Sequence, residues 1–125
     1  MIKSAAVLFG IVFILIGILG FVPGVTNNEM LLGIFHVNVA HNVVHLLSGA
    51  VALFAGMTSV GASRWYFRIF GLVYGLVAIL GLMNMGQHTM LLGLISNNDG
   101  DTFLHIAIAA VSLLLGFMPT SRETV

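Results

Sequence analysis

The sequence predicts an all-α fold, a polytopic membrane four-helix bundle built from two parallel-orientation helical hairpin repeats. The first observation is composition: 59% of the 125 residues are hydrophobic and 6% are charged, whereas a soluble domain carries about 25% charged residues. The second is a set of four apolar stretches, each about long enough for a helix to cross a bilayer. The third is a similarity between the two halves of the chain. Together they predict a single transmembrane domain over residues 1–125.

The four predicted spans cover about 4–22, 37–57, 66–86 and 102–118. Pro23-Gly24 ends the first span, because neither residue continues a helix well. The run NNDGD at residues 97–101 has the composition of a turn and a helix N-cap ahead of the fourth span. The first stretch is long for the apolar region of a signal peptide, and no A-x-A cleavage site follows it. We therefore interpret it as a retained span.

The cationic side chains predict the orientation of the chain. All of them fall on one side of the four-span arrangement: Lys3, Arg64, Arg68 and Arg122. Cationic segments next to membrane spans stay in the cytoplasm. We therefore expect both termini and the 58–65 connection to be cytoplasmic, and the loops at 23–36 and 87–101 to face outward.

Composition also excludes several kinds of site. The net charge of zero gives no basis for a nucleic-acid partner. The absence of cysteine excludes disulfides, iron–sulfur clusters and thiolate metal sites. The sequence contains no nucleotide-binding loop and no supported nucleophile–base pair, and it leaves open whether the chain is an enzyme. The expected surroundings are the lipid bilayer, with a homo-oligomer or a larger membrane complex left open.

An internal repeat relates the second and fourth spans. Residues 30–56 and 90–116 align at an offset of 60 with ten identities in 27 positions. Apolar composition produces chance matches among Leu, Val and Ala, but not readily the pairs Asn38/Asn98 and His45/His105 in the same register. The first and third spans align more weakly, at an offset of 61. Two hairpins of the same orientation, related by an axis along the membrane normal, would give this pattern.

Polar residues recur at matched spacing in the two related spans. His41 and His45 are four residues apart, as are Asp101 and His105, and residues four apart share one face of a helix. Three imidazoles and one carboxylate form a suitable ligand set for Zn²⁺, Cu²⁺, Fe²⁺ or Mn²⁺. The leading interpretation is an outward-facing His/Asp layer that binds a transition metal for redox or sensing.

Three amides flank these candidate ligands: Asn38, Asn42 and Asn98. Side chains of this kind commonly hold metal ligands in place by hydrogen bonds, so we expect them to orient the histidines and the aspartate.

Two other classes of function stay open. The first is a quinone- or haem-binding electron-transfer subunit, in which His45 and His105 would be the axial ligands of a non-covalent haem; a quinone needs only a His or Asn donor beside an apolar slot. The second is a ligand-free structural or accessory subunit, whose Asp–His–Asn network holds helices together. The positive dipole of the first helical turns favours the latter, whereas ionisable residues inside a span favour a functional role.

Three stretches carry a resemblance to a known family: HNVVHLLSG at 41–49, RWYFRIFGLVYG at 64–75 and SNNDGDTFLH at 96–105. They resemble a bacterial family of small four-span membrane proteins catalogued as a domain of unknown function, similar in outline to the DoxX-like group. The resemblance covers nearly the whole chain and implies a four-helix bundle in the bacterial cytoplasmic (inner) membrane. The DoxX-like group implies a redox setting by analogy, while the absence of cysteine argues against a thiol-based mechanism.

Overall fold

A computed structural model describes residues 1–85, 90–92 and 94–119. Its helices are α1 (Ile2–Leu19), α2 (Val39–Thr58), α3 (Val60–Met83) and α4 (Asp99–Phe117). Short strands between α1 and α2 are β1 (Thr26–Asn27), β2 (Met30–Leu31) and β3 (Phe35–His36). All four helices are long and apolar enough to cross a membrane. The mostly helical class and the four candidate spans predicted from sequence are thereby confirmed, and they are consistent with a multi-pass membrane protein.

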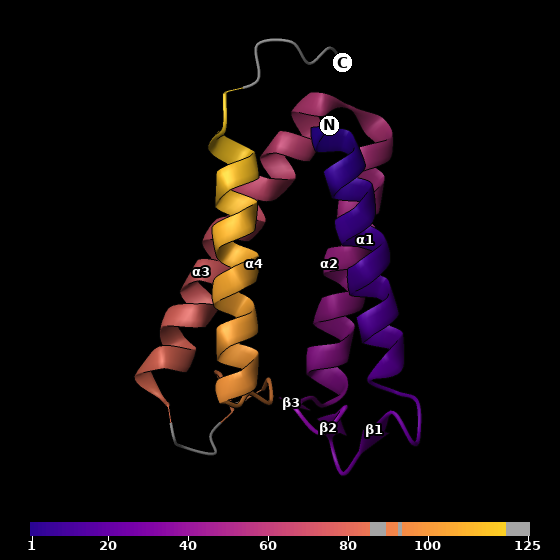
Figure 1. Cartoon of the computed structure of the whole chain (residues 1–125), viewed down its shortest axis with the longest axis vertical. Helices are drawn as coiled ribbons and strands as arrows, with labels where there is room; N and C mark the ends of the chain where they lie inside the picture. The colour runs from indigo at the N-terminus through magenta and orange to yellow at the C-terminus, as the bar shows by residue number, and fades with distance from the viewer. Residues whose placement is uncertain (86–89, 93, 120–125) are drawn as a thin grey trace.

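The helices form two pairs, α1 with α2 and α3 with α4. Figure 1 shows the pairs joined at one end by the α2–α3 connection, where α1 begins and α4 ends. We call this the terminal end. The three strands and the start of both α2 and α4 lie at the opposite end, which we call the loop end. The polar residues of the two related spans are therefore gathered at the loop end.

Glycines let the helices of each pair approach closely. A Cβ atom added to Gly10 of α1 would lie 2.8 Å from the Cβ of Leu53 in α2, and one added to Gly71 of α3 would lie 2.8 Å from Leu113 Cδ2 in α4. Backbones packed this tightly through small residues are typical of membrane helices. These two contacts join residues that correspond in the aligned halves of the sequence.

The connection between α2 and α3 differs from the predicted 58–65 segment. Ser59 alone separates the two helices, with an extended backbone (φ −167°, ψ 166°). Its Oγ accepts a hydrogen bond from the backbone N–H of Ala62 at 2.9 Å, which is the bond of a helix N-cap. The third helix can therefore begin at Val60, where the sequence analysis placed a loop.

The loop end contains a small antiparallel sheet that the sequence analysis did not anticipate. Its strand order is β1-β2-β3, and the turn after β2 uses positive φ angles at Leu32 (55°) and Gly33 (70°). In the other half, Leu91 forms an isolated bridge with Ile95 and is followed by Leu92 with a φ of 54°. Both halves thus turn sharply just before their polar helix begins.

Candidate functional site

Asparagine caps position the polar ends of α2 and α4. The Asn38 side chain accepts from the His41 backbone N–H at 2.9 Å, and the Asn98 side chain accepts from the Asp101 N–H at 2.9 Å. Each cap also reaches the opposite half of the chain: Asn38 Nδ2 donates to the Leu94 carbonyl at 3.0 Å, and Asn98 Nδ2 to the Ile34 carbonyl at 2.9 Å. These reciprocal bonds tie the start of each helix to the loop before the other.

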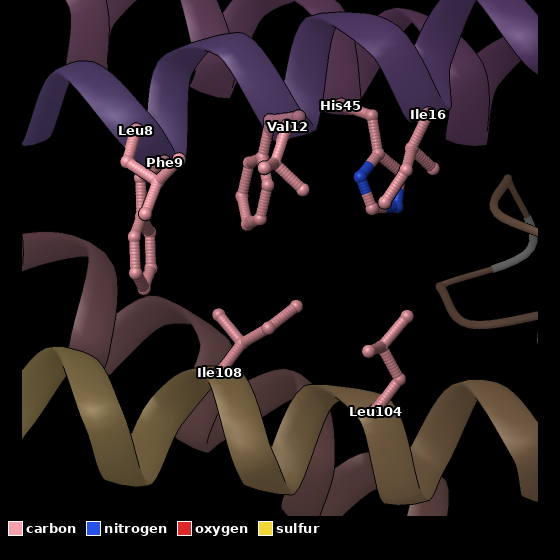
Figure 2. Close-up of a pocket in the computed structure, with 8 residues that line it drawn as sticks. Leu8, Phe9, Val12, Ile16, His45, Leu104 and Ile108 are labelled. Atoms are coloured by element: carbon pink, nitrogen blue, oxygen red, sulfur yellow. The ribbon is translucent and has the colours of Figure 1, made fainter. Parts of the chain in front are cut away.

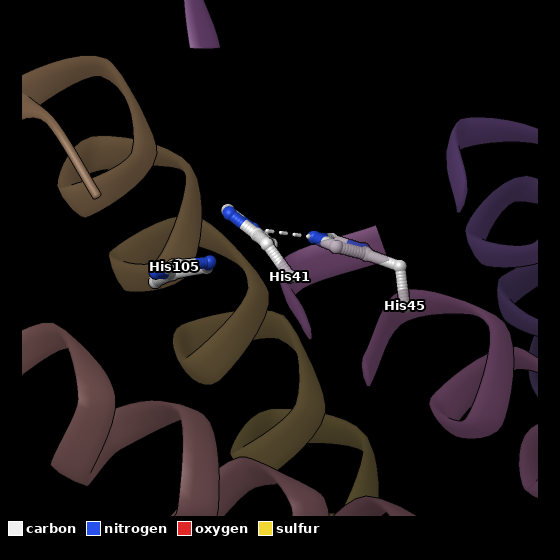
Figure 3. A group of neighbouring side chains, drawn as sticks. All are labelled: His41, His45 and His105. Carbon is white, nitrogen blue, oxygen red and sulfur yellow. Dashed lines mark hydrogen bonds between the residues drawn. The ribbon is translucent and has the colours of Figure 1, made fainter. Parts of the chain in front are cut away.

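Three imidazoles converge between these helix ends. His41 and His45 come from α2 and His105 from α4 (Figure 3), and each is 3% exposed. One ring nitrogen from each lies within 4.8 Å of the others, and the two Nε2 atoms of His41 and His45 are 3.0 Å apart. Two nitrogens bound to one Zn²⁺ at tetrahedral angles lie about 3.3 Å apart. His41 and His45 therefore meet at about the spacing of two ligands on one ion, whereas nitrogens up to 4.8 Å apart would have to move closer to share it.

Backbone carbonyls fix the tautomer of His41. Its Nδ1 lies 2.9 Å from the Ser96 carbonyl oxygen and 3.1 Å from that of His36. A carbonyl oxygen only accepts, so Nδ1 must carry the proton and donate it. In the neutral ring, Nε2 then holds a lone pair directed at the cluster. Metal-binding histidines commonly use this arrangement, in which the distal ring N–H donates to a carbonyl.

The carbonyl partners of His41 were missed by the sequence analysis. Every residue has a carbonyl, so composition carries no signal for them. Their positions in the sequence do give a signal, because His36 and Ser96 correspond at the repeat offset of 60. Residues immediately before each polar helix are therefore candidates for supporting the cluster from both sides.

Two nitrogens of the cluster lack hydrogen-bond partners. His45 Nδ1 and His105 Nδ1 are both buried, and neither bonds any residue that the structure describes. Buried polar atoms in folded proteins are nearly always paired. Both histidines line a cavity of about 120 Å³ together with Ser48 and Tyr74, and His45 also lines a second, larger cavity. The cluster is thus bordered by space rather than closed by its own hydrogen bonds.

Asp101, the fourth predicted ligand, has another set of contacts. Its Oδ2 accepts from the backbone N–H groups of Asn98 and His36, both at 3.0 Å. The first bond completes a capping box at the start of α4, and the second ties α4 to β3. Asp101 is 1% exposed, but it is not in the group of mutually close ligand atoms. Its role as a ligand stays a prediction.

No hydrogen bond joins the predicted orienting amides to the histidine rings in the part of the chain that the structure describes. Asn38 and Asn98 act on backbone groups as helix caps. Asn42 is buried against α1, where a Cβ added to Gly20 would overlap its side-chain amide. The amides therefore position the helices that carry the cluster, and carbonyl groups orient the His41 ring.

The predicted haem ligands, His45 and His105, have ring centroids 6.5 Å apart. The His41 ring lies 4.8 Å from the first and 5.8 Å from the second. A haem held between them would have to displace His41. Haem binding stays an untested prediction.

Comparison with known proteins gives one family match. A family model described as a domain of unknown function, DUF4383, matches residues 3–118. Neither a search of curated proteins nor a search of solved structures found a match. None of these comparisons gives evidence for a relationship with the DoxX-like group. The match covers the four helices except Ile2, together with every residue of the cluster, and the chain therefore belongs to the DUF4383 family.

Proposed function

We propose that this chain is a membrane protein that binds a transition metal ion through His41, His45 and His105, in a redox or sensing role. The convergence of three buried imidazoles within 4.8 Å carries the proposal. The tautomer of His41 supports it, because the Nε2 lone pair lies 3.0 Å from His45 Nε2 inside the cluster. Imidazole ligands suit Zn²⁺, Cu²⁺ and Fe²⁺. Three protein ligands leave a coordination position open, as in catalytic rather than structural zinc sites.

The unpaired nitrogens argue against the ligand-free alternative. A network that served only to hold helices together would satisfy its buried ring nitrogens, whereas His45 Nδ1 and His105 Nδ1 have no partner among the described residues. Asp101 would then anchor α4 and leave the binding to the histidines. Recruiting it as a fourth ligand would weaken its two bonds to backbone N–H groups.

The proposed orientation places the cluster on the outer side of a bacterial inner membrane, with both termini cytoplasmic. The cationic side chains near the end of α4 support it: Arg64 donates to the Met118 carbonyl at 2.8 Å and Arg68 to the Gly116 carbonyl at 2.7 Å. Cysteine placed at Asn28, in the loop end, should react with an impermeant label in intact cells. Cysteine at Gly61, in the terminal end, should not, and the reverse pattern would invert the orientation.

We further propose that the bundle consists of two parallel-orientation hairpin repeats. The reciprocal bonds from Asn38 to Leu94 and from Asn98 to Ile34 support this, since each bond becomes the other under the offset of 60. The likeness to the DoxX-like group rests on sequence outline alone, so the redox setting it implies stays a hypothesis.

Metal analysis of protein purified without a histidine tag tests the proposed function. After loading with Zn²⁺, Cu²⁺ or Fe²⁺ and removal of excess ion, the wild-type chain should retain about one equivalent of one of them. His105→Ala should abolish retention. His36→Ala is the matched control, because His36 lies at the same end of the bundle but pairs with Glu29, and it should retain the ion. Equal retention by both variants, or none by the wild type, would refute the proposal.

A further inference from the structure

An apolar groove lies between α1 and α4, beside the histidine cluster. Its volume is about 220 Å³. Figure 2 shows Val12 and Ile16 of α1 on one side, with Leu104 and Ile108 of α4 facing them. An apolar cavity of about 150 Å³ is large enough to hold benzene, so this groove can accept a single substituted ring.

The groove opens toward the side of the bundle. Two of its lining residues on α1, Leu8 and Val12, are 60% and 40% exposed. In a chain that spans a membrane, such side chains face lipid. A ligand would therefore enter from the bilayer, and it must be apolar enough to dissolve there.

Among the described residues, one polar side chain, that of His45, lines this groove. His45 is 3% exposed, and its ring lies across the groove from Leu104 in Figure 2. Phe13 packs edge-on against it, with ring centroids 5.4 Å apart. The Nδ1 atom of His45 has no hydrogen-bond partner in the described chain. This atom is itself buried, so a ligand in the groove would pair it only after the side chains that cover it shift, and it would need an oxygen on the edge of its ring.

We propose that the groove binds the ring of a lipid-soluble quinone or quinol, with one ring oxygen hydrogen-bonded to His45 Nδ1 and the tail in the bilayer. A phospholipid acyl chain would fill the space but leave Nδ1 unpaired. For a water-soluble ligand, the groove offers neither a polar lining nor an entry path from water. The quinone class combines a flat ring, an edge oxygen and solubility in lipid.

The metal ion should determine whether the groove prefers the quinone or the quinol. This corollary rests on the proposed function. In the ion-free neutral cluster, His41 Nε2 accepts, so His45 Nε2 must donate across the 3.0 Å contact. His45 Nδ1 is then an acceptor and suits a quinol hydroxyl. An ion on His45 Nε2 moves the ring proton to Nδ1, which becomes a donor and suits a quinone carbonyl. Metal loading should shift binding from quinol toward quinone.

Binding of a decyl-substituted benzoquinone to the full-length chain in lipid nanodiscs tests the groove. Val12→Trp fills the groove from its lipid-facing side and should weaken binding at least about tenfold. Ile11→Trp is the matched control, because Ile11 is also lipid-facing at 54% exposure but does not line the groove. It should bind as the wild type does. Both variants should keep their metal content, which also reports that they are folded.

A second pair of variants separates the groove from the metal site. His45→Phe removes the hydrogen bond and should weaken quinone binding by about 2- to 10-fold, the value of one such bond. His105→Phe also removes a proposed metal ligand, but His105 does not line this groove, so quinone binding to the ion-free chain should persist. A wild-type chain that takes up no metal but still binds the quinone would refute only the proposed function. Equal quinone binding by the two tryptophan variants would refute binding in the groove. Displacement of the quinone by decane at equal concentration would refute recognition of its ring.

Discussion

The first turns of α2 and α4 begin alike and diverge at their third residue. Asn38 and Asn98 both cap their helices from an extended backbone, with φ of −138° and −133°. Each side chain accepts the N–H of the residue three positions on, at 2.9 Å. That residue is His41 in α2 and Asp101 in α4.

The residue at this position determines whether the side chain anchors the start of the helix or points into the histidine cluster. A carboxylate three residues after the cap can reach back to the cap's own N–H, and Asp101 does so. The imidazole of His41 instead binds carbonyls of the preceding loops through Nδ1 and directs Nε2 inward. One helix start thus serves as an anchor while its counterpart supplies two of the proposed ligands, and the third imidazole of the cluster, His105, comes from one turn deeper in α4.

The largest expected effect comes from making the two helix starts alike. In His41→Asp, the new carboxylate should cap α2 as Asp101 caps α4 and withdraw from the cluster. Loss of a ligand should weaken metal binding by more than about 100-fold, beyond the 10- to 100-fold typical of residues that only support a ligand. Competition with a coloured chelator measures this. Unchanged affinity would show that His41 is not a ligand.

Asp101→Ala should affect stability more than metal binding. It leaves the N–H groups of Asn98 and His36 without their acceptor. A buried donor left unpaired costs about 1–3 kcal/mol, and these two partly buried donors should each cost up to that amount. Thermal unfolding in detergent should shift clearly downward, while metal affinity at a temperature where the protein is folded changes far less than in His41→Asp. Loss of the metal without loss of stability would restore Asp101 as the fourth ligand.

The two caps should contribute equally. Asn38→Ala and Asn98→Ala each remove one N-cap, worth about 1 kcal/mol, and one reciprocal bond to the other half. The repeat therefore predicts similar losses of stability from the two substitutions, measured by the same unfolding experiment. A several-fold difference between them would contradict the proposed equivalence of the two halves.

The smallest effect belongs to His36→Ala. The His36 side chain is 31% exposed and pairs with Glu29 at 3.3 Å, and exposed ion pairs contribute about 0–1 kcal/mol. Its backbone groups, which bond Asp101 and His41, are retained in the variant. Stability and metal affinity should both stay near those of the wild type, and a large loss of either would extend the site to this side chain.

Local signals account for what the sequence predicted correctly. Apolar runs indicated four candidate spans, and the Asn-rich segment before α4 indicated its cap. The i, i+4 spacing placed His41 and His45 on one buried face. The rest depended on information that is not local. The role of Asp101 depends on the His36 N–H in β3, the tautomer of His41 on the Ser96 carbonyl, and the groove on how α1 meets α4.

X-ray absorption at the edge of the bound metal would show whether His41, His45 and His105 hold one ion. We expect three imidazole ligands, with nitrogen at about 2.0–2.1 Å from a zinc ion. In His105→Ala loaded under the same conditions, the imidazole signal should disappear with the metal. An ion coordinated by fewer than three imidazoles, or a wild-type chain that takes up no metal, would contradict the account.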